Sequence, residues 1–223
     1  MRTGPRTRFR QAARAAAAAA VLALLCTTGP IPPGSAVPRS VDATDFPGVR
    51  QVAEILPEYD GGARHLEDDH AVWVFRRNCL SYRDGPAGEV RAWAYYYPAS
   101  GDAPSYPRFH VQEFATVDDA KQAIRTIRRN AERCYGTYHR DDIDGTFIRR
   151  PADVPSLGDG RPAAWKMNDR WTDDDTGVER VYYSRRIWMR EAETVIGVDL
   201  WGEAPQSRRA SIRLARLVLR TVG

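Results

Sequence analysis

The clearest periodic pattern in the chain lies between residues 117 and 134. Apolar side chains recur there at steps of three and four residues, which places them on one face of an α-helix: Val117, Ala120, Ile124, Ile127, Ala131 and Cys134. Thr116 stands at the N-cap position with Asp119 three residues later, as in a capping box, and Gly136 follows the last turn. The pattern therefore predicts an amphipathic helix that packs by this apolar face.

Weaker helical patterns and a series of strand patterns surround this helix. Helices are predicted at residues 47–56 and 206–222, and strands at residues 71–76, 90–97, 108–115, 163–171, 181–189 and 194–201. Residues 59–70 and 141–161 are predicted to be loops, the second with a short strand near Phe147. Short connections between successive strands favour antiparallel pairing. The expected fold class is therefore α+β, a single domain over residues 47–223 with an antiparallel β-sheet packed by helices.

The last two strands separate their side chains by type. With a turn at Glu191 and Ala192, Met189 pairs with Thr194, and the aliphatic residues gather on one face of the hairpin. The opposite face carries Tyr182, Arg186, Trp188, Asp199 and Trp201. The strand at residues 90–97 alternates in the same way and presents Trp93 and Tyr95.

These seven aromatic and charged residues form the candidate ligand-binding site. Aromatic rings supply contact area and an Arg–Asp pair orients a polar group, which is the composition typical of a small-molecule site. The alternative is that a helix covers this face and the aromatic residues belong to the core, because both faces of a sheet need cover in a layered fold.

The first 36 residues have the layout of a cleavable export signal. A basic segment with five arginines precedes an apolar run from Ala15 to Leu25, and small residues follow as far as Ala36. We expect cleavage between Ala36 and Val37, then a linker at residues 37–46, and a secreted protein without a transmembrane span. Lipid attachment at Cys26 is the alternative, although Leu25 occupies the position where a lipoprotein signal has a small residue.

Two cysteines, Cys79 and Cys134, remain after such processing. An even number of cysteines in an oxidising compartment is typical of a disulfide, so we expect one bridge between them. The alternative is a pair of buried free thiols.

The charge distribution argues against a nucleic-acid partner. The whole chain has 33 basic and 29 acidic residues; removing the five arginines of the export signal leaves 28 basic against the same 29 acidic residues. A protein that follows a phosphate backbone needs a basic excess. The predicted C-terminal helix does carry a row of arginines that either docks an acidic protein partner or is a solvated face: Arg209, Arg213, Arg216 and Arg220.

No catalytic motif stands out. The chain lacks the G-x-S-x-G, H-E-x-x-H, Walker and G-x-G-x-x-G patterns. The segment from His65 to His70 is predicted to be a polar loop, and the acidic run Asp173 to Asp175 lacks the alternating spacing of a calcium loop. We therefore predict no catalytic residue, no metal ligand and no cofactor.

Several segments resemble one family of exported actinobacterial domains: residues 111–120, residues 127–134, residues 155–159 and residues 178–180. Together, residues 50–220 resemble the extracellular sensor domain of PknH-type Ser/Thr kinases. The resemblance implies a disulfide-linked α+β domain outside the cell, with a cleft for an unidentified ligand and no catalytic residues. This chain departs from those domains by carrying one candidate bridge where they typically carry two, and it contains no kinase domain.

These patterns lead to one functional hypothesis with two alternatives. The hypothesis is an exported, non-enzymatic binding domain that takes a small molecule or a cell-envelope component on its aromatic face. The alternatives are a protein-interaction module and a secreted hydrolase whose site is assembled from distant residues.

Overall fold

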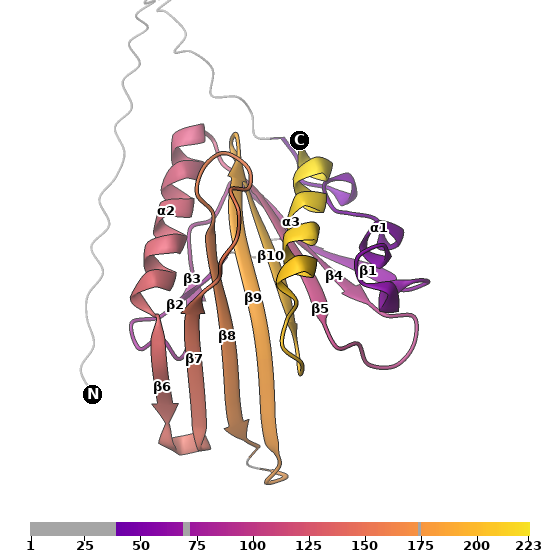
Figure 1. Cartoon of the computed structure of the whole chain (residues 1–223). Coiled ribbons are helices and arrows are strands. Elements are labelled where there is room, and N and C mark those ends of the chain that lie inside the picture. Colours follow the sequence, from indigo (N-terminus) through magenta and orange to yellow (C-terminus); the bar gives the residue numbers. More distant parts are fainter. Residues whose placement is uncertain (1–38, 69–71, 174) are drawn as a thin grey trace, which may run out of the picture. The chain divides into compact units, whose positions relative to one another are not determined.

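The computed structural model describes residues 39–68, 72–173 and 175–223 (Figure 1). The predicted export signal, its cleavage point and Cys26 lie outside these residues and stay predictions. His70, the end of the predicted polar loop, also lies outside them.

The described residues form a predominantly β structure. The strands are β1 Ala63–Asp68, β2 Trp73–Phe75, β3 Tyr82–Asp84, β4 Val90–Tyr97, β5 Tyr106–Glu113, β6 Gly136–Arg140, β7 Gly145–Pro151, β8 Ala163–Thr172, β9 Glu179–Glu191 and β10 Thr194–Gly202. Eight of them make one sheet in the order β1-β4-β5-β10-β9-β8-β7-β6, while β2 and β3 form a separate hairpin. Every neighbouring pair of strands in both sheets is antiparallel, as predicted.

Helical segments connect and cover the strands. They are the α-helices α1 Val49–Ala53, α2 Val117–Arg133 and α3 Arg208–Val222, and the 3-10 turns η1 Ala43–Asp45, η2 Pro57–Tyr59 and η3 Asp141–Ile143. The Thr116 side chain accepts a hydrogen bond from the Asp119 backbone N–H at 3.1 Å, which confirms the predicted cap of α2. Ser207 caps α3 in the same way through the Ala210 N–H.

Apolar side chains on the two faces of the large sheet form two separate cores. On one face, α1 and α3 pack on a cluster that includes Phe109, Ile187 and Leu200. On the other face, α2 and the β2-β3 hairpin pack on a cluster that includes Trp165 and Trp188. Residues next to each other on β9, such as Ile187 and Trp188, thus belong to different cores, as the alternation of a β-strand requires.

The predicted disulfide is confirmed. Cys79 and Cys134 are bonded with their Cα atoms 5.3 Å apart. Cys79 lies in the turn between β2 and β3, and Cys134 ends α2, so the bridge fixes the hairpin to the helix. The buried Asn130 of α2 reinforces this attachment, because its amide both accepts from the Phe75 N–H at 2.7 Å and donates to the Phe75 carbonyl at 2.9 Å.

Several element predictions were wrong. Residues 63–68 lie in the predicted loop 59–70 but form the edge strand β1, which pairs with β4. The short strand predicted near Phe147 is confirmed as β7, but β6, which immediately precedes the predicted loop at residues 141–161, was not predicted. Both β1 and β6 are edge strands with polar sequences, and edge strands bury too little surface to show a clear apolar alternation. The first helix is also shorter than the predicted 47–56, because Pro57 opens a separate 3-10 turn after Leu56.

The predicted register of the last hairpin was wrong by two residues. Glu191, not Met189, pairs with Thr194, so the turn is Ala192 and Glu193. Ala192 adopts a left-handed backbone conformation with φ of 48°. Asn or Gly usually occupies such a position, so an alanine there gives no sequence signal for the turn. A register shift of two residues leaves every side chain on the same face of the sheet, so the assignment of the aliphatic and aromatic faces is correct. The observed register also places Arg186 directly opposite Asp199.

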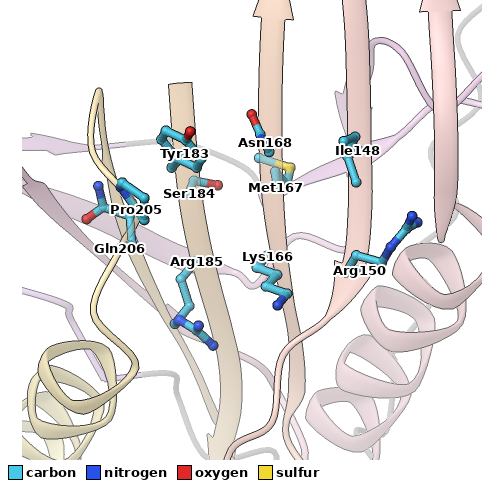
Figure 2. A pocket seen from close by; sticks show the side chains of 10 residues that line it. All are labelled: Ile148, Arg150, Lys166, Met167, Asn168, Tyr183, Ser184, Arg185, Pro205 and Gln206. Atoms are coloured by element: carbon cyan, nitrogen blue, oxygen red, sulfur yellow. The ribbon is translucent and has the colours of Figure 1, made fainter. Parts of the chain in front are cut away.

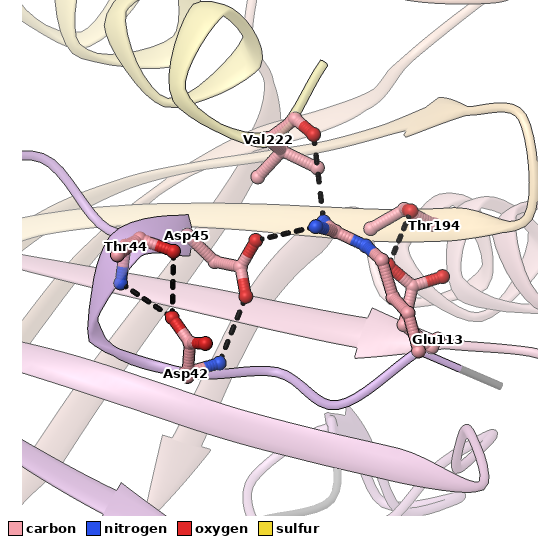
Figure 3. A network of polar contacts seen from close by, with 7 residues as sticks. Asp42, Thr44, Asp45, Glu113, Thr194 and Val222 are labelled. Carbon is pink, nitrogen blue, oxygen red and sulfur yellow. Dashed lines mark hydrogen bonds and ion pairs between the residues drawn. The ribbon is translucent and has the colours of Figure 1, made fainter.

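Part of the predicted linker is built into the fold. Arg39 forms ion pairs of 2.8 Å with Asp45 and with Glu113 at the end of β5, and both carboxylates are buried (Figure 3). Thr194 of β10 donates to the same Glu113 carboxylate at 2.8 Å. Arg39 also donates to the Val222 carbonyl at the end of α3. Residues 39–45 therefore join the central strands to the C-terminal helix.

Candidate functional site

Residues that face each other across neighbouring strands form rows on the face of the sheet that carries α2. One row runs across β4, β5, β10, β9 and β8 and consists of Tyr95, Arg108, Asp199, Arg186 and Trp165. Its charges alternate, because Asp199 is the register partner of both arginines. Opposite charges on directly opposite residues of neighbouring strands attract each other, so the alternation stabilises this row.

The Arg186–Asp199 pair is buried and close. The Arg186 Nε lies 3.1 Å from the Asp199 Oδ2, and the two side chains are only 13% and 7% exposed. Burial by itself lowers the pKa of Arg186, but Asp199, Tyr82 and Asp169 raise it above its ordinary value. For Arg108 burial dominates and lowers its pKa, with Asp199 opposing. Arg186 thus remains a fixed buried cation, and Arg108 is the less well neutralised of the two.

Aromatic rings surround both guanidinium groups. Arg108 lies over Trp93 at 4.7 Å and over Tyr95 at 4.6 Å, and Arg186 lies over Tyr82 at 5.1 Å. Such cation–π contacts stabilise a buried guanidinium without using its N–H donors. The Nε of Arg108 and the Oδ1 of Asp199 have no hydrogen-bond partner within the described part of the chain, whereas the Arg186 Nε is engaged in its ion pair with the Asp199 Oδ2. The row therefore keeps polar capacity that the fold itself does not satisfy.

A cavity of about 290 Å³ opens beside this row, between the β2-β3 hairpin and the strands β8, β9 and β10. Its lining combines the charged row with aromatic residues: Trp73, Tyr82, Arg108, Met167, Asp169, Trp171, Tyr182, Tyr183, Ser184, Arg186, Asp199 and Trp201. The volume is near the lower end of the range for small-molecule sites. This set of residues is called the aromatic pocket below.

Four of the aromatic residues on this face stand next to one another across the strands. Ring centroids are 4.9 Å apart for Tyr106 and Trp201, 6.1 Å for Trp201 and Tyr182, and 5.3 Å for Tyr182 and Trp171. The spacing follows the distance between neighbouring strands. All four rings are half-buried, so they keep part of their surface available to a ligand.

A second ion pair lies at the edge of the aromatic pocket. Arg149 of β7, which is buried, holds the Asp169 carboxylate with both terminal nitrogens. Burial raises the pKa of Asp169, and the Arg149 guanidinium opposes this effect. Burial also raises the pKa of the Tyr82 hydroxyl, which keeps this group neutral at physiological pH.

The structure separates the seven candidate residues into three groups. Tyr182, Arg186, Asp199 and Trp201 line the aromatic pocket. Trp93 and Tyr95 lie behind Arg108 and do not line it. Trp188 is 4% exposed and packs in the α2 core, where its ring fills the space above Gly197. A ligand in the aromatic pocket would therefore meet four of the seven.

Eight lining residues were not singled out from the sequence as site residues: Trp73, Tyr82, Arg108, Met167, Asp169, Trp171, Tyr183 and Ser184. The alternation of the strand at residues 108–115 would have placed Arg108 on this face, had the strand been aligned with β10. Trp73 is a large aromatic residue with 38% of its surface exposed. It reaches the aromatic pocket through the β2-β3 hairpin, which the disulfide joins to the end of α2. No local sequence signal reveals the position of this hairpin above the sheet.

The arginines of the C-terminal helix lie on its outer face. Arg209, Arg213 and Arg216 are exposed around a shallow hollow beside Pro155 and Ile212. Arg213 donates to the Glu54 carbonyl at 2.9 Å. The docking of a protein partner at this row stays a prediction.

Two further searches of the described residues gave no candidate. No group of three or more His, Cys, Asp or Glu side chains is arranged to hold a metal ion within them. None of the helices they form is long and apolar enough to cross a membrane.

The fold is similar to that of a solved structure. The chain is similar in fold to the crystal structure of the extracellular domain of PknH from Mycobacterium tuberculosis, with a TM-score of 0.53 and 15% sequence identity over 82% of this chain and 97% of that one. A weaker similarity, with a TM-score of 0.23 and 11% identity over 70% of this chain and 80% of the other, links it to LpqN, a Mycobacterium tuberculosis protein involved in cell envelope biogenesis. No protein-family model and no curated protein matches the sequence. The predicted PknH-like fold is thus confirmed.

Proposed function

We propose that this protein is an exported, non-enzymatic domain that binds a small molecule or a cell-envelope component in the aromatic pocket. The observation that carries the proposal is the partly buried Arg108–Asp199–Arg186 row at the wall of a cavity lined by Trp and Tyr. A domain gains nothing in stability from leaving buried polar atoms unsatisfied. A ligand that hydrogen-bonds to these atoms would satisfy them.

The charges of the aromatic pocket favour an acidic ligand with a flat apolar part. Asp199 pairs with Arg186, and Asp169 is held by Arg149, so both carboxylates of the lining are already neutralised. Arg108 has no carboxylate of its own within the described residues. A carboxylate or phosphate group on the ligand would complete the row next to Arg108, and the rings of Trp201 and Tyr182 would contact the apolar part.

A matched pair of probes tests this proposal. Isothermal titration calorimetry of the purified protein should show that 2-naphthoate binds at least tenfold more tightly than the neutral 2-naphthamide. Trp201→Ala should weaken naphthoate binding about tenfold, which corresponds to about 1.4 kcal/mol. Arg108→Met should remove the preference for the acid over the amide, because it deletes the unneutralised cation but retains the aromatic contacts.

Tyr97→Ala is the control for this experiment. Tyr97 is an aromatic residue that is 50% exposed and lies outside the aromatic pocket, so its loss should change neither affinity nor preference. Equal binding of acid and amide by the unmodified protein, or an affinity that Tyr97→Ala lowers as much as Trp201→Ala, would contradict the proposal.

A further inference from the structure

A row of three cations crosses the opposite face of the sheet. Arg150 of β7 is the register partner of Lys166 of β8, and Lys166 is the register partner of Arg185 of β9. Side chains directly opposite each other on neighbouring antiparallel strands have Cβ atoms about 5 Å apart, and like charges at such positions repel each other. This arrangement is the reverse of the alternating Arg108–Asp199–Arg186 row on the other face.

None of the three cations has a carboxylate partner in the part of the chain that the structure describes. The acid that acts on Arg185 is Asp153, and its carboxylate is paired with Arg208 at 2.8 Å. The Arg185 Nε is buried without a hydrogen-bond partner. Burial, the largest effect, lowers the pKa of Arg185, and the neighbouring Arg208 lowers it further. The described part of the fold therefore supplies no negative charge to neutralise this row.

The same residues border a hollow of about 370 Å³ on the face that carries α3 (Figure 2). Figure 2 shows the Lys166 and Arg185 side chains extending toward the same end of the hollow, whereas Arg150 lies across the hollow and its guanidinium extends away from them. Ile148, Tyr183 and Pro205 add apolar surface. Among the residues that the structure describes, none that lines the hollow is acidic.

Two buried acceptors also line this hollow. The Asn168 Oδ1 and the Gln206 Oε1 have no hydrogen-bond partner among the described residues, and Gln206 is only 9% exposed. The Gln206 Nε2, in contrast, donates to the Ala204 carbonyl at 2.5 Å, which fixes the orientation of its amide. Unsatisfied buried acceptors require an explanation, and they match a ligand that brings hydroxyl donors.

We propose that Arg150, Lys166 and Arg185, together with Asn168 and Gln206, form a second binding site, which takes a phosphate ester that carries hydroxyl groups. The phosphate oxygens accept from the cations and relieve their mutual repulsion, while the hydroxyls donate to the two amide oxygens. Both a free polyol phosphate and the headgroup of a phospholipid have this chemistry. The site lies on the face opposite the aromatic pocket and shares with it the lining residues Met167, Tyr183 and Ser184, none of which makes the polar contacts proposed here, so the inference goes beyond the proposed function.

Thermal unfolding of the purified protein with glycerol 3-phosphate tests the proposal. Glycerol 3-phosphate should raise the midpoint by several °C relative to glycerol at the same concentration with sodium chloride added to match the ionic strength. Lys166→Glu should abolish this rise, and it should also raise the midpoint of the ligand-free protein, because it converts three like charges into an alternating row. Lys166→Gln should weaken the response without placing an acid in the row.

Arg216→Glu makes the same charge change on the exposed face of α3 and is the matched control. It should leave the response to glycerol 3-phosphate unchanged. Cosedimentation with phosphatidylglycerol vesicles, compared with phosphatidylcholine vesicles, distinguishes the two sources of the ligand. Binding to phosphatidylglycerol that Lys166→Glu reduces at least tenfold, without a response to free glycerol 3-phosphate, assigns the site to a lipid headgroup.

The proposal is overturned by any of three results. One is the absence of both the glycerol 3-phosphate response and the phosphatidylglycerol binding. Another is a response that Arg216→Glu removes as fully as Lys166→Glu, since binding would then depend on general positive charge. The third is a Lys166→Glu variant whose ligand-free midpoint is lower than that of the unmodified protein, since the repulsion would then not exist.

Discussion

Replacing Cys79 and Cys134 together by alanine should lower the free energy of unfolding by about 4 kcal/mol. The bridge joins residues that are 55 positions apart, so it removes a large amount of chain entropy from the unfolded state. Both cysteines are buried, and the change also loosens the β2-β3 hairpin, which carries Trp73 and Tyr82 into the aromatic pocket. Urea denaturation at equilibrium, followed by tryptophan fluorescence, measures the loss.

The unmodified protein unfolded in the presence of a reductant is the control for this double variant. It should lose a similar amount of stability, because the reductant removes the same cross-link without altering the packing of the side chains. A double variant within 1 kcal/mol of the oxidised protein would mean that the bridge does not hold the hairpin to α2.

Trp188→Ala should lower the free energy of unfolding by about 4 kcal/mol, whereas Trp201→Ala should cost about 1 kcal/mol. Trp188 is 4% exposed and packs in the core beneath α2, so its removal leaves a cavity in addition to the lost apolar burial. Trp201 is half-buried at the aromatic pocket and loses mainly its stacking on Tyr106. The same urea experiment compares the two variants.

The two tryptophans form a matched pair, because they lie on the same face of one hairpin and undergo the same chemical change. Ala164→Gly on β8 gives a reference for a small change outside the α2 core. Equal losses for Trp188→Ala and Trp201→Ala would contradict the division of this face into a covered core and an open pocket.

Strands and helices that bury a full face were predictable from the chain, and those that do not were missed. The α2 pattern predicted its extent, cap and packing face because six apolar positions recur on one side. Strands β8, β9 and β10 each alternate between two cores, so their apolar and aromatic positions separate clearly. Strands β1 and β6 lie at the edges of the sheet, where one neighbouring strand is sufficient and polar sequences such as His65–Glu67 or Thr137–His139 are tolerated.

The candidate site was predictable only where it lies within one hairpin. The alternation along β9 and β10 predicted that four residues share one face: Tyr182, Arg186, Asp199 and Trp201. A register error of two residues does not change this prediction, because it moves no side chain to the other face. The tertiary arrangement decides which part of that face a helix covers. The sequence alone therefore could not decide whether Trp188 is a ligand-binding residue or a core residue. The partners that complete the row, above all Arg108, come from a strand more than 70 residues earlier in the chain.

Native mass spectrometry of the purified protein, compared with its denatured mass, tests the central claim most directly. The account predicts an added mass in the native spectrum that disappears on denaturation, that Tyr97→Ala retains and that Trp201→Ala loses. A native protein with no added mass, or an added mass that Trp201→Ala retains in full, would contradict binding in the aromatic pocket.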